Sequence, residues 1–363
     1  MRSAMKITEV KVRSVSLGPL ERPFWNSIVK TMSRGFSRTE VYTDEGIVGM
    51  APGGGGVLKG FIEGAIQNKL KGMDPTRVGH IWDTMYMGGT RKPVARGDYI
   101  VAMSAVDNAI WDLNGKTLGL PVWKLAGGAQ QTVRAYAAGG YYEDEKGLAE
   151  LEAEMISYVK QGFESVKMKV GWPGAGLRHD AERVAAVRKA VGPDIDLMVD
   201  ANNAWDAPTA IQFGRMIGSY GAYWFEEPVR ADDIRGALKV RQTLDLPVAS
   251  GENEYTRWGF RELIEGGGAD IIQADPNTCG GITEWLRIAA IASAHHLPMA
   301  PHGNPQIGST CVAAVENGLI TENYPTAFKN DFLAPVDFKD GQIFLSDEPG
   351  LGLEWNEKLI ESS

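Results

Sequence analysis

Hydrophobic and polar positions follow two different regimes along this chain. Residues 5–16 and 38–49 alternate with the two-residue period of β-strands. Three later segments show the apolar spacing of helices: 57–70, 76–86 and 99–118. Strands followed by a run of helices are typical of an α+β unit. The pattern therefore predicts a first domain, which we place at residues 1–128.

From about residue 132 short apolar strands alternate with helical segments. The predicted strands are TVRAYAA, SVKMKV, IDLMVD, AYWFE, LPVAS, DIIQAD, LPMAPH and GLITE. Such a series of βα repeats predicts the α/β class and a TIM-like barrel, which we place at residues 129–329. An open doubly wound sheet is the competing fold. Polar residues recur at the C-terminal end of nearly every strand, as around a barrel mouth, and favour the barrel. Residues 330–363 should leave it and pack on the first domain.

Three acidic residues follow apolar runs at an even interval. Asp200 closes IDLMVD, Glu226 closes YWFE and Glu252 closes PVASGE, with 26 residues from 200 to 226 and again from 226 to 252. That interval suits a strand, a loop, a helix and a return. Carboxylates at the ends of consecutive parallel strands would converge and repel one another unless a hard cation lay between them. The spacing predicts an Mg²⁺ site and an enzyme.

Two residues beside these acids are further candidates. Asn202 lies two positions past Asp200 and would face the same way if the strand continued, so it could bind substrate or orient a ligand. Glu227 directly follows Glu226 and should face away, which favours a structural hydrogen-bond acceptor.

Lys167 and Lys169 stand two positions apart on the second barrel strand. Side chains two apart share one face of a strand, so both ammonium groups should point inward. Two neighbouring lysines destabilise each other's charged form, and we expect this to lower a lysine pKa toward useful base strength.

An acid and a histidine end the next two strands. Asp275 closes DIIQAD and His302 closes LPMAPH. An aspartate beside a histidine orients one ring nitrogen and supports the imidazolium, leaving the other nitrogen for proton transfer. Glu322 ends the eighth strand, LITE, and could hydrogen-bond a substrate oxygen or an intermediate.

One chemistry fits this set of groups. The proton α to a carboxylate is too weakly acidic for a side chain to remove unless the enediolate is stabilised, and a divalent cation supplies that stabilisation. A lysine and a histidine would then flank the α-carbon from opposite faces. The use of a Lys or His base with Mg²⁺ is the enolase pattern.

The chain resembles the enolase superfamily, and within it the mandelate racemase subgroup. The resemblance covers nearly the whole chain through AMSAVDNAIWDLNGK, VKMKVG, VDANNAW, WFEEPV, SGENE, QADPNTCGG and APHG. It implies a (β/α)7β barrel under an N-terminal α+β capping domain. It also implies roles: Lys169 as base, Lys167 as the lysine that holds the substrate carboxylate and tunes its neighbour, Asp200, Glu226 and Glu252 as metal ligands, Asp275 and His302 as a dyad, and Glu322 as the eighth-strand acid.

The resemblance implies two activities without choosing between them. Members of this subgroup dehydrate acid sugars (aldonates or aldarates) to 2-keto-3-deoxy acids, or racemise and epimerise α-hydroxy and related acids. We favour the dehydratase. The residues leave open whether Lys169 or His302 removes the proton. A symmetric homo-oligomer is also implied.

Two segments of the capping domain should set specificity, because loops of that domain close over the barrel mouth in this fold. They are residues 17–35 and 50–58, and Trp25 in the first is a candidate substrate-binding residue. The first also carries Arg22, Lys30 and Arg34, which could meet a distal carboxylate.

Charge and composition exclude other classes. The net charge of −9 and pI of about 5.2 argue against a nucleic-acid surface. Two cysteines provide no disulfide framework, which favours a reducing cytoplasm. No apolar run reaches the roughly 18 residues of a membrane span. We therefore expect a cytoplasmic enzyme whose partner is a small carboxylate.

Overall fold

The computed structural model describes residues 5–88, 94–326 and 333–361. Its N-terminal part has the predicted α+β organisation, with strands first and helices after them. The elements are β1 (Ile7–Trp25), β2 (Lys30–Thr43), β3 (Val48–Pro52), α1 (Leu58–Gly60), the π-helical η1 (Phe61–Ile66), α2 (Gln67–Leu70), α3 (Val78–Met87), α4 (Asp98–Leu118) and α5 (Val122–Leu125). Gly119 ends α4 in the left-handed conformation, with φ of 67°.

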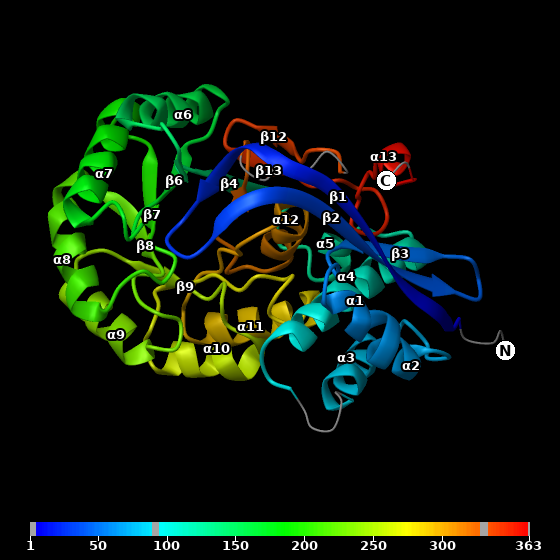
Figure 1. Cartoon of the computed structure of the whole chain (residues 1–363). Coiled ribbons are helices and arrows are strands. Elements are labelled where there is room, and N and C mark those ends of the chain that lie inside the picture. The colour runs from blue at the N-terminus through cyan, green and yellow to red at the C-terminus, as the bar shows by residue number, and fades with distance from the viewer. Residues whose placement is uncertain (1–4, 89–93, 327–332, 362–363) are drawn as a thin grey trace.

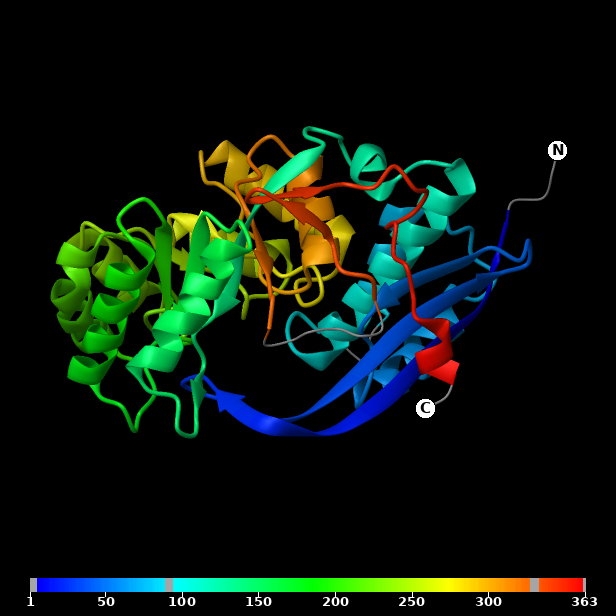
Figure 2. The ribbon, with the colours of Figure 1, turned by 90° about the horizontal axis from the view of Figure 1, so that it is seen from above.

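A long antiparallel hairpin of β1 and β2 reaches from this part to the barrel (Figure 2). The loop expected over residues 17–35 is therefore wrong in extent, because only residues 26–29 lie between the two strands. Register shifts at Ser16/Gly18 and Pro19/Phe24 interrupt the regular pairing. Such bulges break the alternation from which a strand is recognised in sequence, although the backbone pairing continues past them.

Parallel strands form the barrel, and they occur where the sequence pattern predicts them. They are β4 (Thr132–Gly139), β6 (Ser165–Lys169), β7 (Asp196–Asp200), β8 (Ala222–Glu226), β9 (Val248–Ser250), β10 (Ile271–Ile272) and β11 (Thr321–Asn323). They pair in chain order from β4 to β10, and β11 pairs with β4. Single bridges from Met299 to Ile272 and Gly318 occupy the seventh position. The (β/α)7β barrel is thus confirmed.

Helices surround the strands in a ring (Figure 1). They are α6 (Leu148–Lys160), α7 (Leu177–Val191), α8 (Ala207–Ile217) with the 3-10 turn η2 (Gly218–Tyr220), α9 (Ile234–Thr243), α10 (Thr256–Glu265), α11 (Ile282–Ala294) and α12 (Pro305–Ala314). Alternate strand residues divide between two apolar clusters: Val166, Met168 and Val199 join the helix side, and Met198 and Trp224 belong to another. Among the described residues, none of the helices has the length and apolar character needed to cross a membrane.

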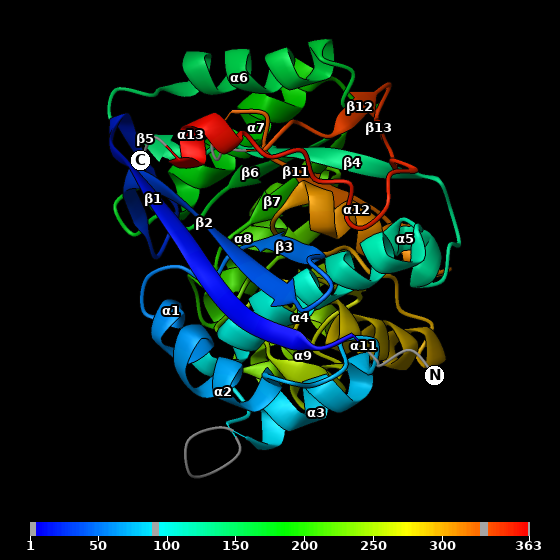
Figure 3. The ribbon, with the colours of Figure 1, turned by 90° about the vertical axis from the view of Figure 1, so that its right-hand side faces the viewer.

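Helix α4 joins the capping part to the barrel. It packs against β2 and β3 on one side and against α11 on the other (Figure 3). Three of its side chains accept hydrogen bonds from the backbone that opens α11: Ser104 from Gly280, Asn108 from Ile282 and Asp107 from Thr283. These buried contacts satisfy N–H groups at the start of α11 that have no partner within the helix.

The C-terminal segment contacts both parts. Strands β12 (Asp337–Lys339) and β13 (Gln342–Phe344) form a hairpin whose second strand pairs with β4. The chain then runs to the capping part, where α13 (Glu357–Glu361) places Glu357 Oε1 2.6 Å from Nη1 of Arg38. The domain boundary that we place between residues 329 and 330 lies outside the described residues.

Candidate active site

Three neighbouring strands bring together four of the candidate side chains. In the parallel register Lys169 on β6 lies opposite Asp200 on β7, and Asp200 lies opposite Glu226 on β8. Lys167 lies two positions before Lys169 and therefore on the same face. All four residues are buried. Strand parity thus places them at one end of the barrel, as the sequence pattern predicts.

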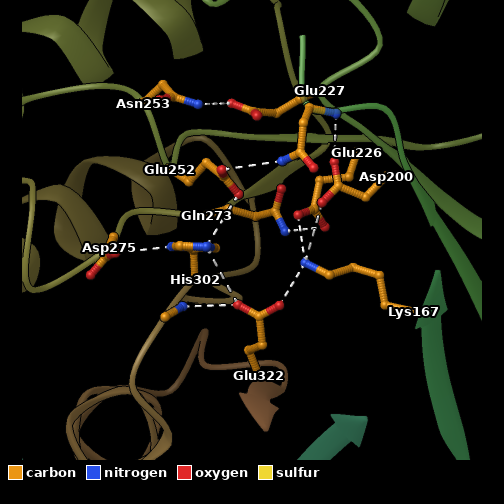
Figure 4. Close-up of polar contacts among 12 residues, drawn as sticks. Lys167, Asp200, Glu226, Glu227, Glu252, Asn253, Gln273, Asp275, His302 and Glu322 are labelled. Atoms are coloured by element: carbon orange, nitrogen blue, oxygen red, sulfur yellow. Dashed lines mark hydrogen bonds and ion pairs between the residues drawn. The ribbon is translucent and has the colours of Figure 1, made fainter. Parts of the chain in front are cut away.

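Glu252 reaches the same place from a turn. Strand β9 ends at Ser250, so the expectation that Glu252 closes this strand is wrong. Its carboxylate still meets the others: one oxygen each from Asp200, Glu226 and Glu252 lie within 4.8 Å of one another. Figure 4 shows the carboxylates gathered between Lys167 and His302. This proximity allows the three acids to share one cation.

Two oxygens at this cluster have the character of metal ligands. Glu252 Oε2 and Asn202 Oδ1 are buried and have no hydrogen-bond partner among the described residues. A buried oxygen without a partner destabilises the fold unless a donor or cation satisfies it. Asn202 has a left-handed backbone, with φ of 42°, so it reaches the site from a turn and not by continuation of β7. Carboxylate and amide oxygens are the donors that Mg²⁺ prefers, so the residues fit a divalent cation.

The lysines are paired with carboxylates, which reverses the expected direction of their pKa values. Lys167 Nζ lies 2.6 Å from Glu226 Oε1 and 2.8 Å from Glu322 Oε1, and Lys169 Nζ pairs with Asp200. Burial is the largest single effect and opposes the charge of Lys169, but Asp200, Tyr141 and Glu252 together outweigh it and raise the lysine pKa. Lys167 does lower the pKa of Lys169, as expected, but this repulsion is the smaller effect. Burial likewise opposes the charge of Lys167, and Glu226 and Glu322 hold its pKa well above the ordinary value.

Two residues that the sequence analysis missed hold Glu226 in place. Trp224 Nε1 and Gln273 Nε2 donate to Glu226 Oε2 at 3.0 and 2.7 Å. Trp224 precedes Glu226 by two positions on β8, so strand parity could have identified it. Burial, followed by repulsion from Asp200, raises the pKa of Glu226 to about 8. Crowded carboxylates of this kind are the groups that a cation would stabilise.

Glu227 faces away from the cluster, as expected from its position after Glu226. It accepts hydrogen bonds from Asn203 and Asn253 at 2.7 Å each. Burial and then repulsion from Glu252 raise its pKa well above the ordinary value. These contacts give Glu227 the structural role of an acceptor between two loops.

Asp275 and His302 form a pair on the other side of the cluster (Figure 4). Both lie beyond the regular strands, since β10 ends at Ile272 and the seventh position has only the bridges at Met299. His302 Nδ1 lies 2.9 Å from Asp275 Oδ2, which leaves Nε2 for other contacts. Burial disfavours the imidazolium, but Glu252, Glu322 and Asp275 outweigh it and hold the His302 pKa well above its usual value.

Glu322 connects the lysine side to the histidine side. Its Oε1 pairs with Lys167, and its Oε2 accepts hydrogen bonds from Gly303 N at 2.9 Å and from Tyr324 Oη at 2.7 Å. Burial would raise its pKa, but Lys167 and His302 outweigh burial and lower it to about 2. Tyr324 was missed by the sequence analysis, although it shares the parity of Glu322.

A cavity of about 760 Å³ opens onto these groups. Lys169 and His302 both line it, together with Asn202 and Glu252. Further lining residues with amide or hydroxyl groups come from the hairpin and from several parts of the barrel domain: Asn26, Thr31, Tyr141, Gln161, Asn304, Gln306, Asn323 and Tyr324. The cavity therefore combines two proton carriers with hydrogen-bonding groups for a polar chain.

The expected specificity segments contribute unequally to this cavity. Among the described lining residues, segment 17–35 provides Asn26, Val29 and Thr31, and segment 50–58 provides none. Trp25 does not belong to the described lining, so its expected substrate contact has no support; its ring packs 5.6 Å from that of Trp172. Gly54 of the second segment has no room for a Cβ beside Thr39, so this segment packs within the capping part.

The three basic side chains expected to meet a distal carboxylate are also not among the described residues that line the cavity. Lys30 Nζ lies 4.5 Å from the centre of the Trp25 ring and 3.8 Å from Asp144 Oδ2. Arg22 and Arg34 are not among the described residues that line the cavity.

Family models match both parts of the chain. The model described as mandelate racemase / muconate lactonizing enzyme, N-terminal domain, matches residues 7–127, and the model described as enolase C-terminal domain-like matches residues 150–359. The chain belongs to the enolase superfamily, in its mandelate racemase/muconate lactonizing enzyme group.

Two relatives are named for a sugar acid and for a sugar-acid lactone. An arabinonate dehydratase of Saccharolobus solfataricus is 35% identical over 336 residues, which are 89% of this chain and 89% of the relative. A D-galactarolactone cycloisomerase of Agrobacterium fabrum is 31% identical over 98% of both chains.

Solved structures share the fold over nearly the whole chain. A putative mandelate racemase from Bordetella bronchiseptica has a TM-score of 0.91 and 32% identity, covering 99% of this chain and 95% of that one. A racemase from Streptomyces coelicolor with bound magnesium has a TM-score of 0.89 and 28% identity, covering 98% of this chain and 99% of that one.

Proposed function

We propose that this protein is an Mg²⁺-dependent acid-sugar dehydratase that converts an aldonate or aldarate to a 2-keto-3-deoxy acid. The observation that carries the proposal is the shared cavity: Lys169 and His302 both line it, together with Glu252 of the acidic cluster. A substrate carboxylate placed at the acidic cluster would have a proton carrier on each side of its α-carbon. Homologous dehydratases with sugar-acid names support this choice of substrate.

Each group of the site has a task in this proposal. Asp200, Glu226 and Glu252, with Asn202 beside them, would hold Mg²⁺. A bound Mg²⁺ would supply positive charge that stabilises the negative charge developing on the substrate carboxylate and would compete with the lysines for the same carboxylate oxygens. Lys167 and Glu322 would orient the substrate carboxylate in this proposal; both are fully buried and are not among the described residues that line the cavity.

The elimination itself requires two proton transfers. Lys169 or His302 removes the α-proton, and the C–O bond to the β-hydroxyl then breaks as the enol forms. The departing oxygen takes a proton from the protonated His302 and leaves as water, and the enol takes a proton at C3 to give the 2-keto-3-deoxy acid. The Asp275 carboxylate at Nδ1 favours the protonated imidazole, which is the form that this step consumes.

Racemisation or epimerisation of an α-hydroxy acid is the second candidate. It is favoured by the same geometry, since two proton carriers open on one cavity and either could return the proton to the opposite face. A solved structure described as a racemase, 28% identical and covering 98% of this chain, is consistent with it.

A library of aldonic and aldaric acids, incubated with the protein and Mg²⁺, tests the proposal. A semicarbazide assay for 2-keto acids should detect turnover of at least one member. Parallel reactions in D₂O report the alternative, because racemisation incorporates deuterium at the α-carbon without loss of water. Deuterium uptake with no keto acid from any member would replace the dehydratase by the racemase. The absence of both signals would refute both functions.

A further inference from the structure

The hydroxyl of Tyr324 lies between Glu322 and His302. Its Oη donates to Glu322 Oε2 at 2.7 Å and lies 3.4 Å from His302 Nε2. Two carboxylate oxygens approach Nε2 less closely, Glu252 Oε2 at 3.6 Å and Glu322 Oε2 at 3.8 Å. Of these three oxygens, the phenol oxygen is nearest to the atom that Asp275 leaves available for proton transfer.

Tyr324 is held in this position through Glu322, which has other contacts that fix its carboxylate. That carboxylate is fixed by Lys167 at 2.8 Å and by the Gly303 N–H at 2.9 Å. Because the phenol gives its proton to Glu322, its oxygen presents lone pairs to Nε2, and donation to a carboxylate strengthens it as an acceptor. The hydroxyl can therefore accept a hydrogen bond from Nε2–H whenever His302 carries its proton.

We propose that Tyr324 is a positioning residue for proton transfer at His302. It holds the imidazole ring between Asp275 at Nδ1 and its own hydroxyl at Nε2, beside the cavity that His302 and Tyr324 both line. Lys169 pairs with Asp200 on β6 and β7, whereas Tyr324 contacts Glu322 and His302. The effect of Tyr324 should thus be confined to the histidine side. The proposal rests on the dehydratase or racemase function above.

The contact itself is tested without substrate. The protein has five histidines, so ¹⁵N-histidine NMR with His302→Asn as the assignment control can identify the His302 ring signals. Tyr324→Phe should shift the Nε2 signal of His302, while Tyr220→Phe, a matched change in η2, should leave it unchanged. Identical His302 spectra in the wild type and Tyr324→Phe would overturn the proposal even if the enzyme proves to be a dehydratase.

The functional role is tested by comparing partial reactions. Dehydration and α-proton exchange in D₂O are measured for wild type, His302→Asn, Lys169→Met and Tyr324→Phe. The step that His302→Asn abolishes should slow about 10- to 100-fold in Tyr324→Phe, mainly in kcat, as is usual when a supporting residue is lost. The step that His302→Asn spares should stay within about twofold of wild type.

Two outcomes separate this proposal from the proposed function. If His302→Asn spares one of the two steps, equal slowing of both steps in Tyr324→Phe would assign Tyr324 a structural role and overturn the proposal. If His302→Asn abolishes both steps, unchanged rates of both in Tyr324→Phe would overturn it. Absence of turnover and of exchange in the wild type would refute the proposed function, and the NMR comparison would still decide whether Tyr324 positions His302.

Discussion

Ser27, at the tip of the β1–β2 hairpin, donates a hydrogen bond to the main-chain oxygen of Asn202, and the two oxygens lie 2.7 Å apart. The contact links the capping part directly to the turn beside the acidic cluster. The hairpin is also paired with the barrel, because Phe24 and Trp25 of β1 bond to β5 (Tyr142–Glu143). The capping hairpin is therefore tied to the barrel in the same place where it lines the cavity.

Ser27→Ala should weaken substrate binding without destabilising the fold. Loss of one buried hydrogen bond is worth about 1 kcal/mol, so kcat/KM should fall about fivefold, chiefly through KM. Steady-state kinetics on the substrate found in the library measures this. Ser33→Ala, on an exposed position of β2, is the control. If both variants behave alike, the Ser27 contact has no part in forming the cavity.

Asp275→Asn should reduce turnover severely while leaving the protein folded. Asparagine keeps a polar contact at Nδ1 but cannot stabilise an imidazolium, so kcat should drop by about 10²- to 10⁴-fold. Asp245→Asn, on an exposed position before β9, provides the matched control. Turnover is followed by keto-acid formation and folding by circular dichroism. Near-normal turnover in Asp275→Asn would show that the dyad is not used.

Glu252→Gln should separate cation binding from folding. The Glu252 Oε2 atom has no hydrogen-bond partner among the described residues, so this substitution removes a ligand charge and few other contacts. Wild-type protein should gain about 2.7 kcal/mol of stability at an Mg²⁺ concentration 100 times the dissociation constant, and the variant much less at the same concentration. Thermal unfolding with EDTA or Mg²⁺ measures both. The control is Glu262→Gln, at an exposed position of α10. If Mg²⁺ raised the unfolding temperature of both variants equally, Glu252 would not be a ligand of the cation.

The stability of the contact between α4 and α11 should depend on pH. Burial raises the pKa of Asp107 to about 7 from its ordinary value of 3.8, although Thr283 donates two hydrogen bonds to it. At pH values between 3.8 and about 7, Asp107 is ionised in the unfolded chain and protonated in the folded protein. The free energy of unfolding therefore falls as pH rises and levels off above about 7. The slope from this group is at most about 1.4 kcal/mol per pH unit.

Asp107→Asn removes this titration and should flatten the profile. The measurement is the difference in unfolding temperature between wild type and variant from pH 4.5 to pH 8, which cancels groups common to both. The wild type should lose stability relative to the variant as pH rises. A constant difference across this range would show that Asp107 does not hold a proton in the folded protein.

The order of the elements and half of the site follow from sequence alone. Alternating strands and helices specify a parallel sheet covered by helices, because each strand must bury both faces and each helix one. The polar residues at the C-terminal end of nearly every strand then favour a barrel over an open sheet. Strand parity places Lys167, Lys169, Asp200 and Glu226 on the inner face, since side chains on a strand repeat every two residues. These inferences need only local periodicity, and periodicity is a property of the chain.

The tertiary structure alone decided the rest. The sequence also singles out Glu252, Asp275 and His302 as site residues, but they lie in turns beyond the strands, where no period relates a residue to its direction, so only the structure shows that their side chains meet. The reach of the hairpin depends on pairing through bulges that hide the alternation. The direction of the lysine pKa values depends on which carboxylates barrel closure brings within contact, and Glu322, which is distant in sequence, is one of them. Electrostatic energies depend on distances in space, and those distances exist only once the chain has folded.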